Sequence, residues 1–170
     1  RNAMLANVYG YARNRFQFLY ECSHVAEDYE SGVARAGPIA EWYALMNSEQ
    51  GIAALRALTG DDRINYADAI ATRYRPGHFL TQHNDEVAAE GRLYAYVLNL
   101  SPQWRADWGG LLMFISDDGH IAEAFTPRLG ALNIFRVPQA HSVSVVSPFA
   151  GAPRYSISGW FRSSRPAARA

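Results

Sequence analysis

Cysteine is nearly absent from this sequence, because Cys22 is the only one among 170 residues. A single cysteine cannot form an internal disulfide, and it excludes a zinc site built on several cysteine ligands. A chain without disulfides fits a reducing compartment, so we expect a cytoplasmic location.

Long apolar runs and net charge are also missing. No run approaches the roughly 18 apolar residues that a membrane helix needs, and no signal peptide is visible. Sixteen basic residues balance sixteen acidic ones. This balance gives no electrostatic reason to expect nucleic acid or an anionic membrane as a partner, so we expect neither.

Apolar side chains, in contrast, are plentiful. They make up 49% of the sequence and aromatic residues make up 13%, which is typical of a globular protein that can bury a core. The length of 170 residues suits one compact domain. We expect this domain to span residues 1–162, followed by a flexible, proline-broken tail at 163–170.

The pattern of apolar residues divides the chain into two unlike parts. It predicts a helical region between about Pro38 and Asp61, and alternating aromatic residues predict a strand over Arg15–Tyr20. After Asp68, short apolar runs alternate with turn signals. The runs predict the strands Ala69–Tyr74, Leu93–Leu100, Leu111–Ile115, Ala131–Phe135, Ser142–Val146 and Tyr155–Phe161.

Short strands at near-regular spacing predict a sandwich or jelly roll. The fold class is therefore α+β and mainly β, with N-terminal helices packed on the outside of one sheet. A helical support would span about 1–66 and the strand-rich core about 67–162.

Candidate metal ligands begin with the triplet His83-Asn84-Asp85. In an extended segment, side chains two residues apart point to the same side, so one metal ion could bind both. Alone, the triplet also fits a polar turn. His141 opens a later alternating strand, and two imidazoles with one carboxylate leave coordination positions open. This donor set is typical of non-haem Fe(II) oxygenases.

Arg154-Tyr155-Ser156 follows on the next predicted strand. In an antiparallel hairpin this strand would run beside the one that begins at His141, which would place Arg154 near the metal. A buried guanidinium needs an anionic partner, and its planar fork fits a carboxylate. A dicarboxylate cosubstrate would supply that partner, and Ser156 could donate a further bond. A surface arginine in a surface ion pair is the alternative.

The order and spacing of these residues resemble the prolyl-4-hydroxylase-like family of 2-oxoglutarate- and Fe(II)-dependent dioxygenases. The similarity covers roughly residues 68–162 and is strongest to the branch of the ribosomal prolyl hydroxylases. The matching residues are Tyr74-Arg-Pro-Gly77, His83-x-Asp85, Glu90-Gly91-Arg92, Gly109-Gly110, Pro127…Gly130, His141 and Arg154-x-Ser156-Ile-Ser-Gly-Trp160-Phe161.

The resemblance implies a double-stranded β-helix (jelly roll) and a dioxygenase that hydroxylates a C–H bond. Its cofactors would be Fe(II) and 2-oxoglutarate, with ascorbate in a supporting role. His83, Asp85 and His141 would be the catalytic iron ligands. Arg154 would bind the distal carboxylate of 2-oxoglutarate.

Two further cosubstrate contacts follow from the resemblance. Tyr74 would be a phenol that helps to hold 2-oxoglutarate. Relatives often present a tyrosine on the strand predicted at 93–100, where this chain has Asn99. We expect Asn99 to contact the cosubstrate through a shorter side chain that can still donate a hydrogen bond.

The resemblance also points to a prolyl residue as the target, and hence to a proline-containing protein or peptide as the partner. Hydroxylation of a small molecule by the same scaffold is one alternative. A jelly-roll module that binds metal without turnover is another, and a zinc hydrolase with Glu86 as its general base is a third. The complete ligand set together with Arg154 favours the oxygenase.

The remaining histidines and tryptophans are expected to take no part in the chemistry. We expect His78 and His120 to face solvent, and we assign no role to His24. The tryptophans are expected to pack in the core and at its rim: Trp104, Trp108 and Trp160.

Overall fold

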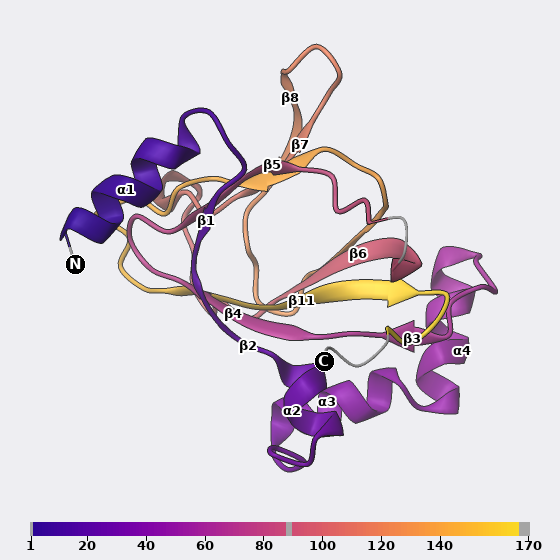
Figure 1. Ribbon diagram of the computed structural model, residues 1–170. Coiled ribbons are helices and arrows are strands. Elements are labelled where there is room, and N and C mark those ends of the chain that lie inside the picture. The colour runs from indigo at the N-terminus through magenta and orange to yellow at the C-terminus, as the bar shows by residue number, and fades with distance from the viewer. Residues whose placement is uncertain (1, 88–89, 167–170) are drawn as a thin grey trace.

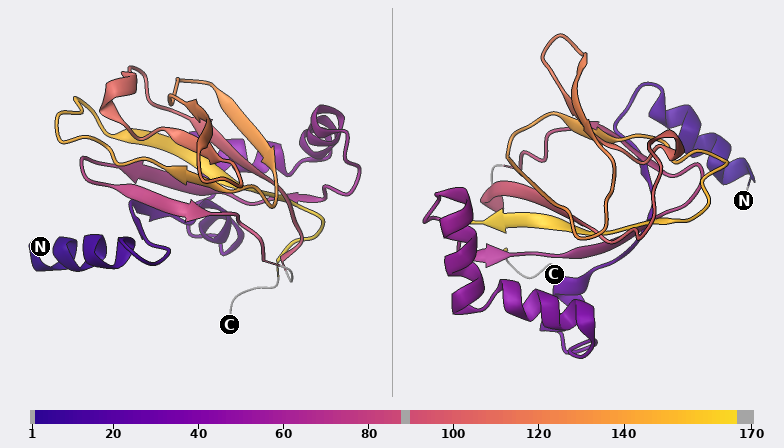
Figure 2. Two further views of the ribbon diagram at one scale, coloured as in Figure 1. Left: turned by 90° about the horizontal axis from the view of Figure 1, so that it is seen from above. Right: turned by 180° about the vertical axis from the view of Figure 1, so that it is seen from behind.

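The computed structural model describes residues 2–87 and 90–166 (Figure 1). Two antiparallel β-sheets lie face to face, and helices cover the outer surface of one of them (Figure 2). This arrangement is the predicted jelly roll, mainly β with an N-terminal part that contains the helices. The helices are α1 (Asn2–Ala12), α2 (Val25–Glu30), α3 (Pro38–Met46), α4 (Glu49–Thr59) and the short 3-10 helix η2 (Ala106–Trp108).

The smaller sheet has the strand order β1-β5-β10-β7-β8. Its strands are β1 (Phe18–Leu19), β5 (Phe79–His83), β10 (His141–Val143), β7 (Leu112–Ile115) and β8 (Ile121–Phe125). Across β5 and β10, His83 pairs with His141. Two histidines that are far apart in the sequence therefore lie side by side.

The larger sheet has the order β2-β4-β11-β6-β9, and β3 pairs with β11. Its strands are β2 (Glu21–Ser23), β4 (Ile70–Tyr74), β11 (Arg154–Arg162), β6 (Arg92–Asn99), β9 (Leu132–Arg136) and β3 (Tyr66–Ala67). Successive side chains of a strand point to opposite faces. On β6, Ala95 and Val97 face the space between the sheets, and Tyr94 belongs to the core under the helices.

Helices α3 and α4 confirm the helical region predicted between Pro38 and Asp61. Pro38 lies in the first turn of α3, where backbone N–H groups have no partner within the helix, so the N–H that proline lacks is not needed. The helix α4 begins after Ser48, whose hydroxyl accepts a hydrogen bond of 3.0 Å from the Gly51 amide. It ends at Gly60, which has a left-handed φ of 69°.

The main hydrophobic core lies between the helices α2–α4 and the outer face of the larger sheet. Tyr43 of α3 and Leu55 of α4 are buried there against Phe161 of β11. Tyr96 stacks on Phe161 with ring centroids 4.8 Å apart. This packing confirms that the helices support one sheet from outside, and it leaves the inner face of that sheet free to line a cavity.

The N-terminal segment crosses from one sheet to the other. In α1, the Tyr9 ring lies 5.8 Å from the Phe79 ring, and the Tyr9 hydroxyl donates a hydrogen bond to the Gly77 carbonyl (3.0 Å). Next, β1 pairs with β5 of the smaller sheet, and β2 then pairs with β4 of the larger one. The strand predicted over Arg15–Tyr20 is therefore shorter, because the chain changes sheets at Tyr20.

Seven of the described elements were missed by the sequence patterns: α1, α2, η2, β2, β3, β5 and β8. All five residues of β8 are exposed, so burial imposes no alternation on their sequence. The helix α2 has six residues, too few for a clear helical period. In β5, polar Thr81 and Gln82 interrupt the apolar pattern.

No helix among the described residues is both long and apolar enough to cross a membrane. Part of the expected flexible tail, residues 167–170, lies outside the described residues. The beginning of the tail contacts the domain, since the Ser163 amide donates a hydrogen bond to the Gly91 carbonyl (2.9 Å). The Arg165 guanidinium also lies 3.7 Å from the Glu30 carboxylate.

Candidate active site

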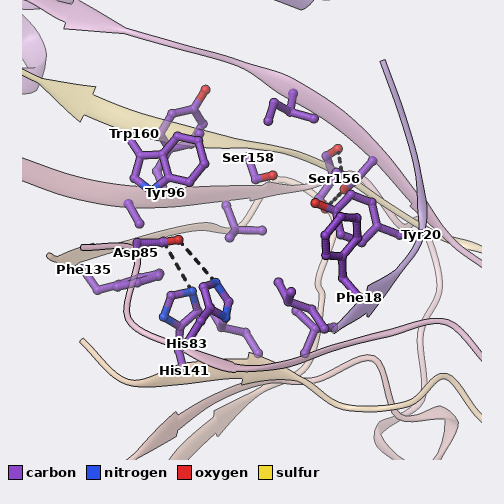
Figure 3. A pocket seen from close by; sticks show the side chains of 18 of the residues that line it. Phe18, Tyr20, His83, Asp85, Tyr96, Phe135, His141, Ser156, Ser158 and Trp160 are labelled. Carbon is purple, nitrogen blue, oxygen red and sulfur yellow. Dashed lines mark hydrogen bonds and ion pairs between the residues drawn. The ribbon is translucent and has the colours of Figure 1, made fainter. Parts of the chain in front are cut away.

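Three side chains from distant parts of the sequence meet between the two sheets (Figure 3). His83 ends β5, His141 begins β10, and Asp85 lies just past β5. One donor atom from each residue lies within 4.8 Å of the other two. The Asp85 carboxylate is 3.3 Å from Nε2 of His83 and 3.5 Å from Nε2 of His141. The fold thus brings the predicted ligand set to one point.

Asp85 does not lie in an extended segment, which corrects the expectation for the pair His83 and Asp85. The strand β5 ends at His83, and Asp85 has a left-handed φ of 62°. Aspartate tolerates this conformation better than most residues, because its short polar side chain can bond locally. A turn, rather than a shared strand face, brings the carboxylate to both imidazoles.

Backbone carbonyls orient both imidazole rings. Nδ1 of His83 lies 3.0 Å from the Thr81 carbonyl, and Nδ1 of His141 lies 2.7 Å from the Gln139 carbonyl. A carbonyl oxygen can only accept, so each Nδ1 carries the proton and each Nε2 presents a lone pair. Both rings are therefore held in the tautomer that suits a metal ligand.

Burial and neighbouring charge set the protonation states of the site. Burial lowers the pKa of His141, and the nearby His83 lowers it further. For Asp85, burial acts to raise the pKa, but the adjacent imidazoles of His83 and His141 outweigh it and leave the pKa below its usual value. An ionised carboxylate and a neutral imidazole are the forms that bind a divalent cation.

Arg92 holds the turn that carries Asp85. Its Nη1 donates a hydrogen bond of 3.0 Å to the Asp85 carbonyl, and its Nε and Nη2 donate to Glu90 Oε2 at 3.0 and 2.7 Å. The guanidinium also lies over the Trp160 ring, 3.7 Å from its centre. No role was assigned to Arg92 from the sequence, although Arg92 belongs to the motif Glu90-Gly91-Arg92, which matches the family and could have pointed to it.

Trp160 corrects a second expectation, because it lines the cavity beside Asp85 and does not only pack in the core (Figure 3). Its indole Nε1 is buried and has no partner among the described residues. The backbone amide of Trp160 donates a hydrogen bond to Asp68 Oδ1 (2.6 Å), and Asp68 also pairs with Arg162 (2.6 Å). A buried polar network therefore fixes the strand from which Trp160 reaches the site.

Arg154 lies inside the protein with 2% of its surface exposed. Its Nη1 donates a hydrogen bond to Ser156 Oγ (3.2 Å), whereas its Nε has no partner among the described residues. Burial lowers the pKa of Arg154, and among the described residues only the Tyr74 phenol counteracts this. A buried cation without an anion beside it is costly, and a ligand could supply the negative charge that Arg154 does not find among the described residues.

The position of Arg154 differs from the predicted hairpin. Strands β10 and β11 belong to opposite sheets, so His141 and Arg154 approach the cavity from its two sides. On the larger sheet, Arg154 pairs with Tyr74 of β4. The number of residues between His141 and Arg154 fits a hairpin within one sheet as well as a crossing to the other sheet, so the spacing could not distinguish them.

One cavity of about 240 Å³ joins the cluster of His83, Asp85 and His141 to Arg154. Leu80, Leu112 and Val143 give it apolar walls, and strands of both sheets contribute to its lining. The N-terminal segment adds three aromatic side chains to the cavity lining, namely Phe16, Phe18 and Tyr20. A divalent cation and an anionic molecule could therefore be held together in one apolar enclosure.

A family model described as the 2OG-Fe(II) oxygenase superfamily matches residues 69–162, more than half of the chain. This stretch contains His83, Asp85, His141 and Arg154. The chain belongs to this superfamily. The family predicted from the sequence motifs is thereby confirmed.

Two curated proteins similar in sequence to this chain are both named prolyl 3-hydroxylase OGFOD1. The protein of Xenopus laevis is 37% identical over 101 residues, which cover 55% of this chain and 19% of the relative. The protein of Mus musculus is 34% identical over 114 residues, which cover 63% and 20%. The matched stretch thus spans about a fifth of the length of these relatives.

Solved structures share the fold of this oxygenase chain. A prolyl-4-hydroxylase of Pseudomonas putida gives a TM-score of 0.61 at 21% identity, covering 94% of this chain and 84% of that one. A 2OG-Fe(II) family oxidoreductase of Burkholderia pseudomallei gives 0.65 at 15%, covering 96% and 80%. A prolyl hydroxylase of Trichoplax adhaerens, in complex with a hypoxia inducible factor peptide, gives 0.50 at 17%, covering 95% and 90%. These matches confirm the jelly-roll fold.

Fe(II) and 2-oxoglutarate, the predicted cofactors, are those of this superfamily. The residues present fit both. Two imidazoles and one carboxylate form a donor set that suits Fe(II) and leaves positions open. The unpaired guanidinium of Arg154 suits a carboxylate, which it can bind through two parallel hydrogen bonds.

Tyr74 and Ser156 lie where the resemblance to this oxygenase family placed them, because both line the cavity with Arg154. The Tyr74 ring is 5.1 Å from the Arg154 guanidinium. The Ser156 hydroxyl is 2.7 Å from the Thr72 hydroxyl. Both side chains can therefore contact a molecule that Arg154 binds.

Asn99, in contrast, does not join the other predicted cosubstrate residues. Its amide donates hydrogen bonds to the Ala131 carbonyl (3.0 Å) and to Asn133 Oδ1 (2.9 Å), away from the cavity lining. At the end of β6, Asn99 thus ties the sheet to the chain entering β9. Ala95 and Val97 are among the residues of β6 that line the cavity, whereas Asn99 is not.

The other histidines lie outside the site. His24 and His120 are exposed. His78 corrects the expectation that it faces solvent, because it is half-buried and its Nδ1 has no partner among the described residues. Burial lowers the pKa of His78.

Proposed function

We propose that this chain is an Fe(II)- and 2-oxoglutarate-dependent dioxygenase that hydroxylates a prolyl residue of a protein. The observation that carries the proposal is a single cavity with two complementary sites. One is the cluster of His83, Asp85 and His141, and the other is the unpaired buried cation of Arg154. The family and the curated prolyl 3-hydroxylases support the same assignment.

His83, Asp85 and His141 would bind Fe(II) through two imidazole nitrogens and a carboxylate oxygen. Bound Fe(II) and 2-oxoglutarate supply the oxidising chemistry, in which O2 is consumed, 2-oxoglutarate becomes succinate and CO2, and a C–H bond becomes C–OH. Each Nδ1–H donates a hydrogen bond to a backbone carbonyl, so both Nε2 lone pairs are available to the metal. Only a neutral imidazole binds a metal ion, so the affinity for Fe(II) should fall on acidification.

Arg154 would bind the distal carboxylate of 2-oxoglutarate, with the hydroxyls of Ser156 and Tyr74 beside it. The pocket holds a cation in place before the anion arrives, so little reorganisation is needed. The apolar side chains of Leu80 and Val143 exclude water from the same cavity. Exclusion of water strengthens the attraction between guanidinium and carboxylate.

The alternatives fit the structure less well. A zinc hydrolase would need Glu86 as its base, but Glu86 is exposed and does not line the cavity. Arg154 would also remain without an anion in a hydrolase or in a module that binds only metal. For the substrate, the curated relatives are named prolyl 3-hydroxylases, and the Trichoplax adhaerens enzyme was solved with a peptide. These names favour a polypeptide over a small molecule.

Three further expectations belong to this proposal. The single domain would span residues 1–162, because β1 and β2 of the N-terminal part complete both sheets of the core. A cytoplasmic location fits the one thiol, Cys22, which is free and exposed. Ascorbate would support turnover by keeping the iron reduced.

Anaerobic titration tests the function. Fe(II) and then 2-oxoglutarate are added to metal-free protein, and the visible charge-transfer band of the complex is recorded. We expect a band in the wild type that is lost in Asp85→Ala and weakened in Arg154→Ala. Asp118→Ala is the matched control, because Asp118 is an exposed carboxylate outside the cavity. A wild-type protein that is folded but shows no band would overturn the proposal.

A further inference from the structure

The N-terminal segment contributes a row of aromatic rings to the cavity, and we call Phe16, Phe18 and Tyr20 the aromatic strip. These residues alternate along the chain, so their side chains point to one side. The ring centroids of Phe16 and Phe18 are 6.0 Å apart, and those of Phe18 and Tyr20 are 5.2 Å apart. All three line the cavity, and Figure 3 shows Phe18 and Tyr20 pointing into it.

The aromatic strip connects the two ends of the proposed site. At one end, the Phe16 ring is 5.4 Å from the His83 ring. At the other end, Tyr20 stacks on Tyr74 with ring centroids 5.0 Å apart. This wall comes from residues that precede the stretch 69–162 matched by the family model. It can therefore give this chain a specificity of its own.

Two members of the aromatic strip leave much of their surface uncovered. Phe16 is 57% exposed and Phe18 is 47% exposed, although both line the cavity. Burying apolar surface is worth roughly 25 cal/mol for each Å² removed from water. A ligand that covers these rings would gain that free energy. Aromatic-lined surfaces are a recurrent docking site for proline-containing segments.

An open groove continues from the aromatic strip to the outside. Residues 13–16 form one side, 81–84 form the other, and Ala140 completes the lining. Phe16 and His83 line both the groove and the cavity. The groove has a volume of about 760 Å³, against about 240 Å³ for the cavity, so it has room for more than one residue.

The chemistry of the groove suits an extended peptide with acidic residues. Asn14, Gln82 and Asn84 offer carboxamides that can both donate to and accept from a peptide backbone. Arg13 and Arg15 add two positive charges, and the lining contains no carboxylate. Within the described residues, neither arginine has an ion pair that would neutralise it.

We propose that Phe16 and Phe18 form the substrate wall of the site and pack against the target prolyl residue of an extended, acidic polypeptide. The residues that flank the target lie in the adjoining groove, where Arg13 and Arg15 attract carboxylates. This inference rests on the proposed oxygenase function and names the class of its substrate.

The first test uses a pool of soluble peptides, each with one central proline, and detects hydroxylated products by mass spectrometry. Phe16→Ala and Phe18→Ala are expected to lower kcat/KM for the peptides that react by about tenfold, the scale of a lost apolar contact. The loss should exceed any loss of 2-oxoglutarate affinity in the charge-transfer titration. Phe149→Ala is the matched control, since Phe149 is 68% exposed and lies outside the cavity and the groove.

The second test compares two pools in which the proline is flanked by aspartate or by lysine. The wild type should prefer the acidic pool, and the doubly changed variant R13E/R15E should lose or reverse that preference. Arg105→Glu is the control, because Arg105 pairs with Asp107 at the surface away from the groove. Added salt should weaken the preference, as screening predicts for exposed charges.

The outcomes separate this inference from the function on which it rests. A wild type that forms no charge-transfer band contradicts the oxygenase itself. If the band forms but no peptide is hydroxylated, or free proline reacts as well as the peptides, the polypeptide class is wrong. An unchanged kcat/KM in both phenylalanine variants, or a parallel loss of 2-oxoglutarate affinity, removes the assigned role of the aromatic strip.

Discussion

The guanidinium of Arg92 donates a hydrogen bond of 3.0 Å to the backbone carbonyl of Asp85, the residue with a φ of 62°. The same guanidinium bonds to Glu90 and covers Trp160, so the turn after β5 is fastened to β6 and β11. A ligand held in place before the metal arrives loses less freedom on binding. Arg92 would therefore affect metal binding at the proposed site by fixing the backbone of Asp85.

Arg92→Lys should lower the affinity of the metal-free protein for Mn(II), a spectroscopic substitute for Fe(II), by about tenfold or more. Lysine keeps the charge, but one ammonium cannot bond to Asp85 and Glu90 while covering the Trp160 ring. Binding is measured from the electron paramagnetic resonance signal of free Mn(II). Arg105→Lys, the same change in an exposed ion pair, should bind like the wild type. Equal affinity in both variants would remove the role given to Arg92.

Glu90 makes this network sensitive to acid. Burial acts to raise the pKa of Glu90, but the hydrogen bonds and charges of Arg162 and Arg92 outweigh it and hold the pKa below its usual value. The folded state thus binds fewer protons than the unfolded state near the ordinary glutamate pKa of about 4.3. The stabilisation is complete above that pH and is lost as the pH falls through the folded pKa.

Glu90→Gln should therefore lower the free energy of unfolding by about 1 kcal/mol at neutral pH, since glutamine cannot carry the charge. The difference from the wild type should shrink below the ordinary glutamate pKa of about 4.3. Urea unfolding at a series of pH values checks this. A gap that stays constant from neutral to acidic pH would contradict it.

The cluster of His83, Asp85 and His141 and the buried Arg154 could be predicted from the types of these residues and their spacing. His83 and Asp85 stand two residues apart, and His141 and Arg154 each open a strand with a clear apolar pattern. Few arrangements other than a bound metal and a bound anion use such residues inside a core. The strands β4, β6, β9 and β11 were predictable for another reason, since each is a short apolar run bounded by turn signals.

What could not be predicted is which sheet each strand joins and which face meets the cavity. The spacing from His141 to Arg154 fits a hairpin and a crossover equally. Asn99 stands at the end of β6, where its bonds to Ala131 and Asn133 override simple alternation. The alternation of Phe16 with its neighbours predicted a strand, but nothing local shows that their rings close a cavity built by other elements.

Gly159 allows a close contact between β11 and the loop that carries Asp68. A Cβ atom added at Gly159 would lie 2.4 Å from the Asp68 backbone oxygen and 2.5 Å from its Oδ1. Gly159→Ala should therefore lower the free energy of unfolding by about 1–3 kcal/mol, because backbone atoms would have to move. Gly10→Ala is the control, since nothing lies within 4 Å of its added Cβ and alanine favours a helix. Thermal unfolding that shows Gly159→Ala as stable as the wild type would contradict the contact.

Arg154 and Arg162 are both buried arginines of β11, and they differ in their partners. Arg162 pairs with Asp68 (2.6 Å) and with Glu90 (2.9 Å), whereas Arg154 has no carboxylate partner among the described residues. A paired charge supports the fold, and removing it leaves its partners uncompensated in the interior. An unpaired buried charge destabilises the folded state until an anionic ligand binds to it.

Arg154→Met should therefore raise the free energy of unfolding of the ligand-free protein, by about 1–4 kcal/mol, because it replaces an uncompensated buried charge with an apolar side chain of similar length. The same change should weaken 2-oxoglutarate binding by about 100-fold, since the carboxylate loses its charged donor. Arg162→Met, the matched control, should lower the free energy of unfolding by about 3–5 kcal/mol. Urea unfolding with and without 2-oxoglutarate measures both effects. If Arg154→Met destabilises the ligand-free protein as Arg162→Met does, Arg154 is a structural residue and not a ligand anchor.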